Sequence, residues 1–250
     1  MRIAVIGTGY VGLTTSACLA EIGHTVIGYD IDSEKIKKLQ QGICPIFETE
    51  LPELLIKNLA LKTLFFSNSI KDAIKDAEVI FICVGTPPKE DGSPDLSCME
   101  KVIEDIGKNL TKYAVIVEKS TVPVKTAEWM KTFLKKYLKI PFDVAVNPEF
   151  LREGTSVHDF LHPDRIVVGT ETKKAADIMS AVYEKVNAPI LHTNLDSAEL
   201  IKHASNSFLA IKISYANMIA QLCEKTNADI KTVMEGVGLD SRIGKTFFNA

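Results

Sequence analysis

A glycine-rich turn constrains this chain more than any other segment, because of what stands on either side of it. The turn reads Gly7-Thr8-Gly9-Tyr10-Val11-Gly12 and follows the apolar run 3–6. A helix-periodic segment, Gly23 and a second apolar run that ends at Asp30 come after it. This order predicts a βαβ unit in which the N-terminus of the helix faces bound phosphates.

Each glycine of the turn has a predicted role. Gly7 lets the chain leave the first strand sharply, Gly9 leaves room for a pyrophosphate, and Gly12 lets the helix pack closely on the strand. We therefore predict that a dinucleotide contacts Gly7, Gly9, Tyr10, Val11 and Gly12. A tight turn without a ligand is the alternative, and it accounts for Gly7 and Gly12 but not for the acidic residue at position 30.

Asp30 indicates which dinucleotide binds. Its carboxylate follows the glycine turn by about twenty residues, where it can accept hydrogen bonds from the adenosine ribose. A 2'-phosphate would meet the negative charges of Asp30 and Asp32, so NAD is favoured over NADP. Lys35, and the lack of an arginine directly after Asp30, leave this preference as an inference.

Charge and hydropathy restrict the partners. The 250 residues carry a formal net charge of −3, so nucleic acid is not expected as a main partner. No apolar run approaches the roughly eighteen residues of a membrane span. The chain passes from Met1 straight into a strand without a signal-peptide pattern. We expect a cytoplasmic protein that does not bind membranes.

The cysteines and histidines predict neither a disulfide framework nor a metal site. Five cysteines form no CxxC pair, which indicates free thiols. Cys18 and Cys83 stand among apolar neighbours and are expected to be buried rather than nucleophilic. His158 and His162 are four residues apart, but Pro163 follows at once and no third ligand is near.

Short apolar runs alternate with helix-periodic segments along most of the chain. After 25–30 these runs lie at 64–67, 79–84, 114–117, 144–146, 166–169 and 189–192. The alternation predicts an α/β fold with a doubly wound, mostly parallel Rossmann-type sheet, whose ligands gather at the carboxyl ends of the strands. We predict an NAD-binding domain at 1–194 and the start of a central helical domain at 195–250.

A long helix is predicted at 195–226, followed by a short one at about 229–236. Asp196 and Glu199 resemble a capping box at its start. Its apolar positions cover more than one stripe, so we expect it to be buried on several sides, joining two domains or forming a homodimer interface. A core helix of one domain is the alternative.

Two pairs of polar residues are candidates for chemistry. Lys202 and Asn206 are four residues apart on one helix face and could stabilise an oxyanion. From spacing alone, a salt bridge between Lys202 and Glu199 is favoured instead. Thr86 and Thr121 each follow a predicted strand and offer hydroxyl groups near a nicotinamide, with helix capping as the alternative.

Glu149 and Glu153 follow another strand end. If the segment continues as a helical turn, their carboxylates face one way and either could activate a water molecule. Arg152 and Arg165 are possible salt-bridge partners that would keep both pKa values ordinary.

Five ordered stretches make the whole chain resemble the UDP-glucose/GDP-mannose dehydrogenase family. They read MRIAVIGTGYVGL, FICVGTPP, EKSTVPVKT, NPEFLREGTSVHDFLHPDRIVVG and AELIKHASNSFLAIKISYANMIA. PEFLREG running into HPDRIVVG is most similar to the UDP-glucose 6-dehydrogenase branch, and GDP-mannose dehydrogenase is the near alternative.

The resemblance implies a reaction and a role for each candidate. The family oxidises the C6 alcohol of a nucleotide sugar to a carboxylate with two NAD+, through a thiohemiacetal and a thioester on a cysteine. Thr121 and Glu149 would position or activate the hydrolytic water, and Glu153 would lie between cofactor and sugar. Lys202 and Asn206 would stabilise the developing oxyanion, which overrides the salt-bridge alternative.

The resemblance also implies the binding residues. Cofactor contacts fall on Asp30, Lys35, Thr86, Thr121 and Glu153. The substrate UDP-glucose would contact Phe150, Leu151, Arg152, Glu153, Lys202 and Asn206, and Arg242 would reach the sugar nucleotide of a neighbouring subunit.

One family feature does not occur among these residues. The glycine-rich loop GxGxGGxCxxKD, which carries the nucleophilic cysteine, has no counterpart here, and Cys223 lies in the long helix well before its expected place. We therefore expect a fragment that is inactive alone. Two different functions would also use such a glycine turn: a dehydrogenase of the 6-phosphogluconate type, against which NPEFLREG argues, and a non-catalytic NAD-binding module.

Overall fold

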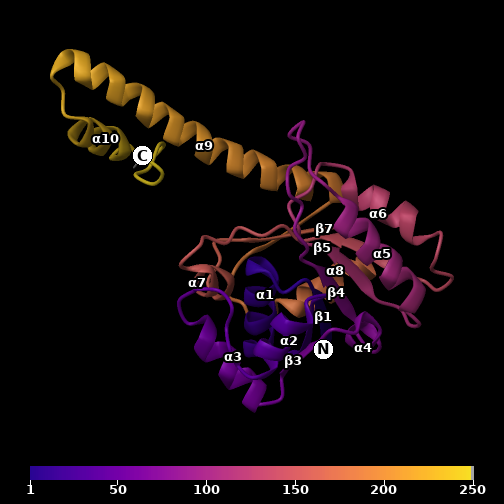
Figure 1. Ribbon diagram of the computed structural model, residues 1–250. Coiled ribbons are helices and arrows are strands. Elements are labelled where there is room, and N and C mark those ends of the chain that lie inside the picture. Colours follow the sequence, from indigo (N-terminus) through magenta and orange to yellow (C-terminus); the bar gives the residue numbers. More distant parts are fainter. Residues whose placement is uncertain (249–250) are drawn as a thin grey trace. The chain divides into compact units, whose positions relative to one another are not determined.

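A computed structural model describes residues 1–248 of the chain. It divides into two units, Met1–Leu200 and Ile201–Ala250, and each is described by itself. The larger unit is an α/β sheet with helices on both faces (Figure 1).

One eight-stranded sheet organises the larger unit, in the order β3-β2-β1-β4-β5-β6-β7-β8. Its first six strands are parallel, β7 runs antiparallel to β6, and β8 is parallel to β7. The predicted fold class is confirmed. The strands are β1 (Arg2–Ile6), β2 (Thr25–Tyr29), β3 (Leu64–Ser67), β4 (Val79–Ile82), β5 (Val115–Glu118), β6 (Asp143–Val146), β7 (Ile166–Thr170) and β8 (Ile190–Thr193).

The central strands are buried on both faces, because helices cover both sides of the sheet. All residues of β4 and β5 are buried, as expected for parallel strands in an α/β fold. α1 packs against α3 and α7, whereas α4 packs against α5 and α5 against α6. The helices are α1 (Tyr10–Glu21), α2 (Ser33–Gln40), α3 (Leu51–Ala60), α4 (Ile70–Ile74), α5 (Ser97–Asn109), α6 (Thr126–Leu134), α7 (Ser156–Leu161) and α8 (Lys173–Val182).

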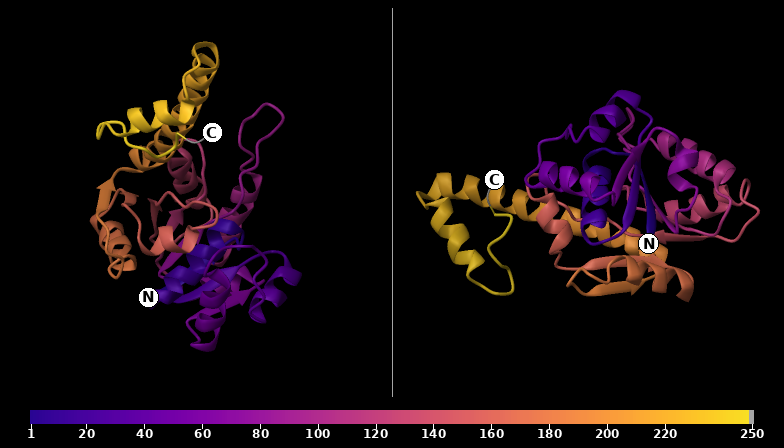
Figure 2. Two further views of the ribbon diagram at one scale, coloured as in Figure 1. Left: turned by 90° about the vertical axis from the view of Figure 1, so that its left-hand side faces the viewer. Right: turned by 90° about the horizontal axis from the view of Figure 1, so that it is seen from below.

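The strand order changes direction between β1 and β4. The chain builds β2 and β3 on one side of β1 and then returns to form β4 on the other side. The loops after these two strands therefore diverge, which is where doubly wound sheets bind ligands. The loop after β4 extends from the sheet as a narrow excursion (Figure 2), closed by a bridge between Pro88 and Pro94.

The long helix α9 (Leu195–Thr226) has the predicted bounds, but its first turn is not capped as predicted. Asn194 Oδ1 accepts a hydrogen bond from the backbone N–H of Ser197 at 2.8 Å, so Asn194 caps the helix. The carboxylate of Glu199 instead accepts hydrogen bonds from Lys125 N (2.6 Å) and Ala127 N (2.8 Å), at the start of α6. The predicted capping box of Asp196 and Glu199 is therefore wrong.

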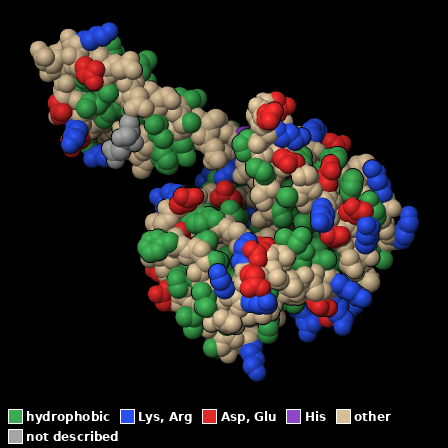
Figure 3. All heavy atoms as spheres, viewed as in Figure 1, with side chains coloured by type: hydrophobic (Ala, Val, Ile, Leu, Met, Phe, Trp, Pro, Cys, Tyr) green, Lys and Arg blue, Asp and Glu red, His purple; other side chains and the backbone are tan. Residues whose placement is uncertain are grey.

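In the smaller unit α9 packs against α10 (Ile230–Gly238) through a small cluster that includes Ala216, Met234 and Phe248. Burial on several sides was predicted, but one apolar stripe of α9 is exposed. Its five members are between 43% and 62% exposed, and hydrophobic side chains are visible on the surface of this unit in Figure 3. The apolar stripe consists of Phe208, Ile211, Tyr215, Met218 and Leu222.

Candidate functional site

The glycine turn joins β1 to α1 and leaves its backbone open. Gly7 has a φ of +94°, and a Cβ there would lie 2.7 Å from the carbonyl oxygen of Cys83. A Cβ on Gly12 would lie 1.8 Å from the carbonyl oxygen of Gly7. A Cβ on Gly9 would meet no atom within 4 Å, and no side chain caps the N-terminus of α1 there. The turn therefore fits a dinucleotide, whose pyrophosphate oxygens would accept hydrogen bonds from the uncapped N–H groups.

Asp30 lies just after β2 and faces the glycine turn. Its Oδ2 accepts hydrogen bonds from Thr8 N (3.0 Å), Thr8 Oγ1 (2.8 Å) and Lys35 Nζ (2.8 Å). Burial favours a higher pKa for this carboxyl group, but these bonds and one from the backbone N–H of Asp32 outweigh it and lower the pKa. Asp30 therefore stays ionised and fixed beside the turn.

The loops after β4 and β5 meet at the carboxyl edge of the sheet. Thr86 Oγ1 donates a hydrogen bond to the carbonyl oxygen of Thr121 at 2.8 Å. Ser120 Oγ donates to the carbonyl oxygen of Val84 at 2.7 Å, so two bonds join the loops. The Thr86 hydroxyl thus binds a neighbouring loop rather than capping a helix.

The segment after β6 is irregular and does not form the helical turn proposed for Glu149 and Glu153. Glu149 Oε2 accepts a hydrogen bond from Leu151 N at 2.7 Å, a local contact that competes with helix formation. Glu153 is exposed, and Gly154 follows it with a φ of +88°. The two carboxylates therefore do not share a helical face.

Arg152 pairs with an acidic residue other than Glu149 and Glu153. Arg152 pairs with Asp159, with Nη2 to Oδ1 at 2.6 Å and Nε to Oδ2 at 3.0 Å. The Arg165 guanidinium lies 4.1 Å from the centre of the Phe150 ring. Arg152 therefore stabilises the turn before α7.

A buried polar network lies under this segment. Asn147 Nδ2 donates to the carbonyl oxygen of Val167 at 2.8 Å, and its Oδ1 accepts from Lys119 Nζ at 3.0 Å and the Tyr183 hydroxyl at 2.5 Å. These bonds fix the point where the irregular segment leaves β6.

Glu48, which no sequence motif indicated, is only 3% exposed and lies in the loop before α3. Its carboxylate accepts hydrogen bonds from the Tyr10 hydroxyl, Gly154 N (2.9 Å) and Ser156 N (2.9 Å). The only local signal was an acidic residue directly after two apolar ones, and the partners of Glu48 are up to 108 residues away.

Three further candidates lie in the smaller unit. Lys202 is only 6% exposed on α9, whereas Asn206, one turn later, is exposed. Arg242 is exposed and pairs with Asp240, with Nη2 to Oδ2 at 2.6 Å.

Comparison with known proteins assigns these features to one family. Residues 1–187 match the NAD binding domain of the UDP-glucose/GDP-mannose dehydrogenase family, and residues 196–250 match its central domain. The chain belongs to this family. It therefore contains an NAD-binding domain of an oxidoreductase family, and the predicted cofactor is confirmed.

Relatives match the chain along its full length. UDP-glucose 6-dehydrogenase TuaD of Bacillus subtilis is 47% identical over all of the chain, which covers 54% of that protein. A UDP-glucose dehydrogenase structure from Pyrobaculum islandicum is 40% identical with a TM-score of 0.96, over 99% of this chain and 58% of that one. The GDP-mannose dehydrogenase structure from Pseudomonas aeruginosa is 35% identical with a TM-score of 0.90, over 96% and 57%. The chain spans just over half the length of these relatives.

Two cysteines of the larger unit, Cys18 and Cys83, are buried. Burial raises the pKa of Cys83 to about 12 and that of Cys18 well above its usual range. Both residues are buried, as predicted, and their raised pKa values favour the protonated thiol at neutral pH. All five cysteines are unpaired. Among residues 1–248 no group of three or more histidine, cysteine or acidic side chains could hold a metal ion, and no helix is long and apolar enough to cross a bilayer.

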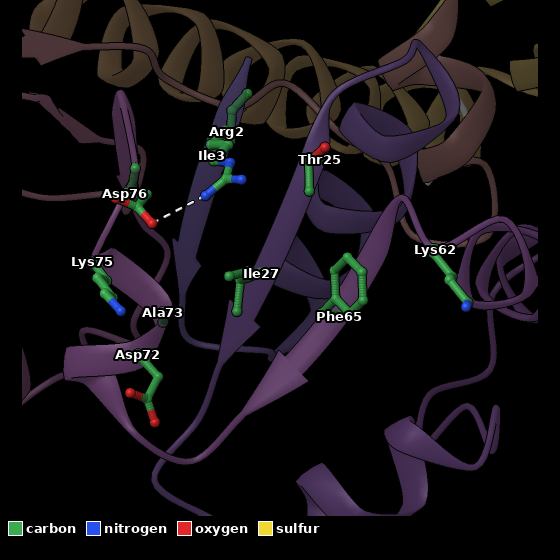
Figure 4. A pocket seen from close by; sticks show the side chains of 11 residues that line it. Arg2, Ile3, Thr25, Ile27, Lys62, Phe65, Asp72, Ala73, Lys75 and Asp76 are labelled. Carbon is green, nitrogen blue, oxygen red and sulfur yellow. Dashed lines mark hydrogen bonds and ion pairs between the residues drawn. The ribbon is translucent and has the colours of Figure 1, made fainter.

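A hollow of about 370 Å³ lies away from the candidate site. Figure 4 shows Arg2 and Thr25, which stand at the amino ends of β1 and β2, together with Phe65 of β3 and Asp72 of α4. The glycine turn is at the opposite, carboxyl ends of the same strands. This hollow is therefore not the dinucleotide site.

Proposed function

We propose that the chain is the NAD-binding and part of the substrate-binding region of a UDP-glucose 6-dehydrogenase. The complete protein would oxidise UDP-glucose to UDP-glucuronate, a precursor for polysaccharide biosynthesis. The observation that carries this proposal is the 47% identity to a UDP-glucose 6-dehydrogenase over every part of the chain. The glycine turn, Asp30 and the loops after β4, β5 and β6 all lie within that match.

The overall reaction is a four-electron oxidation. One primary alcohol, two NAD+ and one water give one carboxylate, two NADH and three protons. NAD+ supplies the hydride acceptor in both oxidation steps. The cysteine of the family binds the aldehyde as a thiohemiacetal, which is then oxidised to a thioester, and water cleaves the thioester to release the thiol and the carboxylate.

The described residues support a division of roles at the carboxyl ends of the strands. The glycine turn, Asp30 and Lys35 bind the adenosine and phosphate end of NAD, and Thr86 and Thr121 lie near its other end. The hydrogen bond between these threonines joins the two loops that would frame the nicotinamide. Glu153, exposed on the neighbouring segment, would lie between cofactor and sugar.

The substrate-binding roles fall on the segment after β6 and on the smaller unit. Phe150, Leu151 and Arg152 would hold the nucleotide sugar, and the pairing of Arg152 with Asp159 shapes the backbone for that contact. Lys202 and Asn206 would stabilise the C6 oxyanion, and Glu149 with Thr121 would position water. Arg242 would reach the site of a second subunit.

These 250 residues alone do not complete the reaction, in our proposal. The thioester route needs a thiolate at the site, and two of the five thiols are buried with raised pKa values. Slow oxidation of alcohol to aldehyde is the most that this chain would catalyse. Its five unpaired cysteines agree with a reducing, cytoplasmic compartment.

We further propose that the chain forms a homodimer through α9. The apolar stripe has residues spaced alternately three and four apart from Phe208 to Leu222, the spacing of a helix–helix seam. A second copy of this helix would bury five large side chains that are now exposed.

GDP-mannose is the alternative substrate, because the Pseudomonas aeruginosa structure is also close, with a TM-score of 0.90. A chimera tests the choice: residues 1–250 joined to the cysteine-containing C-terminal half of the Bacillus subtilis relative. We expect kcat/KM for UDP-glucose to exceed that for GDP-mannose at least a hundredfold, by NADH absorbance at 340 nm. A chimera that prefers GDP-mannose would overturn the assignment. A folded chimera that binds NAD+ but oxidises neither sugar would favour a non-catalytic NAD-binding module.

A further inference from the structure

Glu48 is a buried carboxylate in a loop, where burial of an unpaired charge would be costly. The hydrogen bonds to its two oxygens offset this cost. Burial favours a higher pKa, but the bonds from Tyr10, Gly154 and Ser156 outweigh it and lower the pKa of Glu48. The side chain is therefore an ionised group that accepts several hydrogen bonds.

The partners of Glu48 come from two elements that are distant in sequence. One oxygen accepts from the Tyr10 hydroxyl and from Gly154 N, and the other accepts from Ser156 N. The Tyr10 hydroxyl also lies 3.1 Å from the carbonyl oxygen of Arg152. In Figure 1 the loop before α3, which carries Glu48, runs beside α7. One carboxylate thus holds the segment 152–156 against the first residue of α1.

Tyr10 gives this contact a link to the cofactor. It is the first residue of α1 and directly follows Gly9, whose backbone is open to a phosphate group. A dinucleotide bound at the turn would order the backbone of Tyr10, and its side chain would then be ordered against Glu48 at lower entropic cost. By the same linkage, ordering of segment 152–156 would favour NAD binding at the glycine turn.

We propose that Glu48 is a positioning residue that couples NAD binding at the glycine turn to the ordering of segment 152–156. That this segment contacts the nucleotide sugar rests on the proposed function. The coupling itself requires only that the chain binds NAD. Glu48 acts through its contacts to Tyr10, Gly154 and Ser156.

Hydrogen exchange measured by mass spectrometry tests the coupling on the 250-residue chain. In the wild type, we expect saturating NAD+ to slow amide exchange in peptides covering 152–157 several-fold. In Glu48→Gln, these peptides should exchange about tenfold faster without NAD+, because an amide cannot accept as many bonds as a carboxylate. NAD+ should still protect the glycine turn but no longer segment 152–157. The exposed neighbour Glu50→Gln removes the same charge and should behave like the wild type.

A second variant separates the coupling to NAD from the stability of segment 152–156 itself. Tyr10→Phe removes one hydroxyl and keeps the backbone of the glycine turn. It should leave the bonds from Gly154 and Ser156 in place, so that exchange without NAD+ stays near the wild-type rate while NAD+-dependent protection of 152–157 is lost. Protection that persists in both Tyr10→Phe and Glu48→Gln would overturn the proposal. So would wild-type exchange in 152–157 that NAD+ does not change.

Adding UDP-glucose to the NAD+-bound chain tests the coupling and the substrate role of segment 152–156 separately. Additional protection of 152–157 supports both the coupling and the substrate role of this segment. If NAD+ protects the segment and UDP-glucose adds nothing, the coupling stands and the proposed substrate role of the segment fails.

Discussion

Asp30 accepts two hydrogen bonds from one residue of the glycine turn, from the backbone N–H of Thr8 at 3.0 Å and from its hydroxyl at 2.8 Å. The carboxylate that would select the adenosine ribose therefore also fixes the loop that would hold the pyrophosphate. Cofactor choice and loop conformation depend on the same side chain.

Removing the charge of Asp30 should change both properties. In Asp30→Asn, the pairing with Lys35 at 2.8 Å is weakened, and we expect the free energy of unfolding to fall by about 1–3 kcal/mol. NAD+ should bind about tenfold more weakly and NADP+ should lose less affinity, because the charge facing its 2'-phosphate is gone. Calorimetric titration with both dinucleotides measures the change, with exposed Glu34→Gln as control. An unchanged ratio of the two affinities would refute the selective role of Asp30.

Two glycines of the turn should respond in opposite ways to alanine. A Cβ on Gly9 meets no atom within 4 Å, so Gly9→Ala should unfold within about 2 °C of the wild type and lose at least about tenfold in NAD+ affinity. A Cβ on Gly12 would lie 1.8 Å from the carbonyl oxygen of Gly7, so Gly12→Ala should be strongly destabilised. Thermal unfolding with and without NAD+ reports both effects. A Gly9→Ala variant with wild-type affinity would place the pyrophosphate elsewhere.

The buried Glu118 should make the free energy of unfolding depend on pH. It is 2% exposed, and burial followed by the charge of Glu199 raises its pKa well above the usual 4.5. The folded protein therefore holds a proton that the unfolded chain releases near its ordinary pKa. Glu118 contributes its full stabilisation below the pKa that it has in the unfolded chain. This contribution is lost as the pH rises through the higher pKa of the folded protein. Urea unfolding across pH 5–9 should show that Glu118→Gln gains stability relative to the wild type toward alkaline pH. A difference that stays constant with pH would contradict this.

Lys202 should affect catalysis rather than folding of the larger unit. In the chimera, we expect Lys202→Ala to lower kcat about 10²–10³-fold, the usual cost of removing one oxyanion-stabilising group. NAD+ affinity should stay within about twofold of the wild type. The exposed Lys225→Ala on the same helix is the matched control. A loss of NAD+ binding equal to the loss of kcat would argue for a structural role.

The apolar stripe predicts the effect of a charge on oligomeric state. Ile211 is 62% exposed and belongs to the stripe, so Ile211→Glu should place a charge in the proposed seam. We expect sedimentation velocity to show a dimer for the wild type and a monomer for the variant at micromolar concentration. Asn217→Glu adds the same charge at an exposed polar position and should remain dimeric. A wild type that sediments as a monomer would refute the interface.

Local sequence patterns predicted the sheet because strand and helix periodicities are properties of neighbouring residues. The run 3–6 and the glycines after it imply a strand, a turn and a helix without reference to the rest of the chain. The antiparallel direction of β7 depends on the path of the chain through α7, and no local sequence pattern predicts it. The cap of α9 was mispredicted for a similar reason, since the partners of Glu199 lie more than seventy residues earlier.

Site residues were predictable to the extent that they belong to a motif with its own chemistry. The glycine turn and Asp30 have such a motif, and the structure places them side by side. Glu48 has none, because its proposed role depends on Tyr10 and Gly154, which only the fold brings near it. The helical turn at Glu149 was wrong because this side chain satisfies the backbone N–H of Leu151 instead.

The number of NADH molecules formed per UDP-glucose tests the central claim most directly. The chimera, given limiting UDP-glucose and excess NAD+, should reach an endpoint at 340 nm of two NADH per sugar, while residues 1–250 alone should not approach it. An endpoint of one NADH per sugar in the chimera, or two NADH per sugar from residues 1–250 alone, would contradict the account.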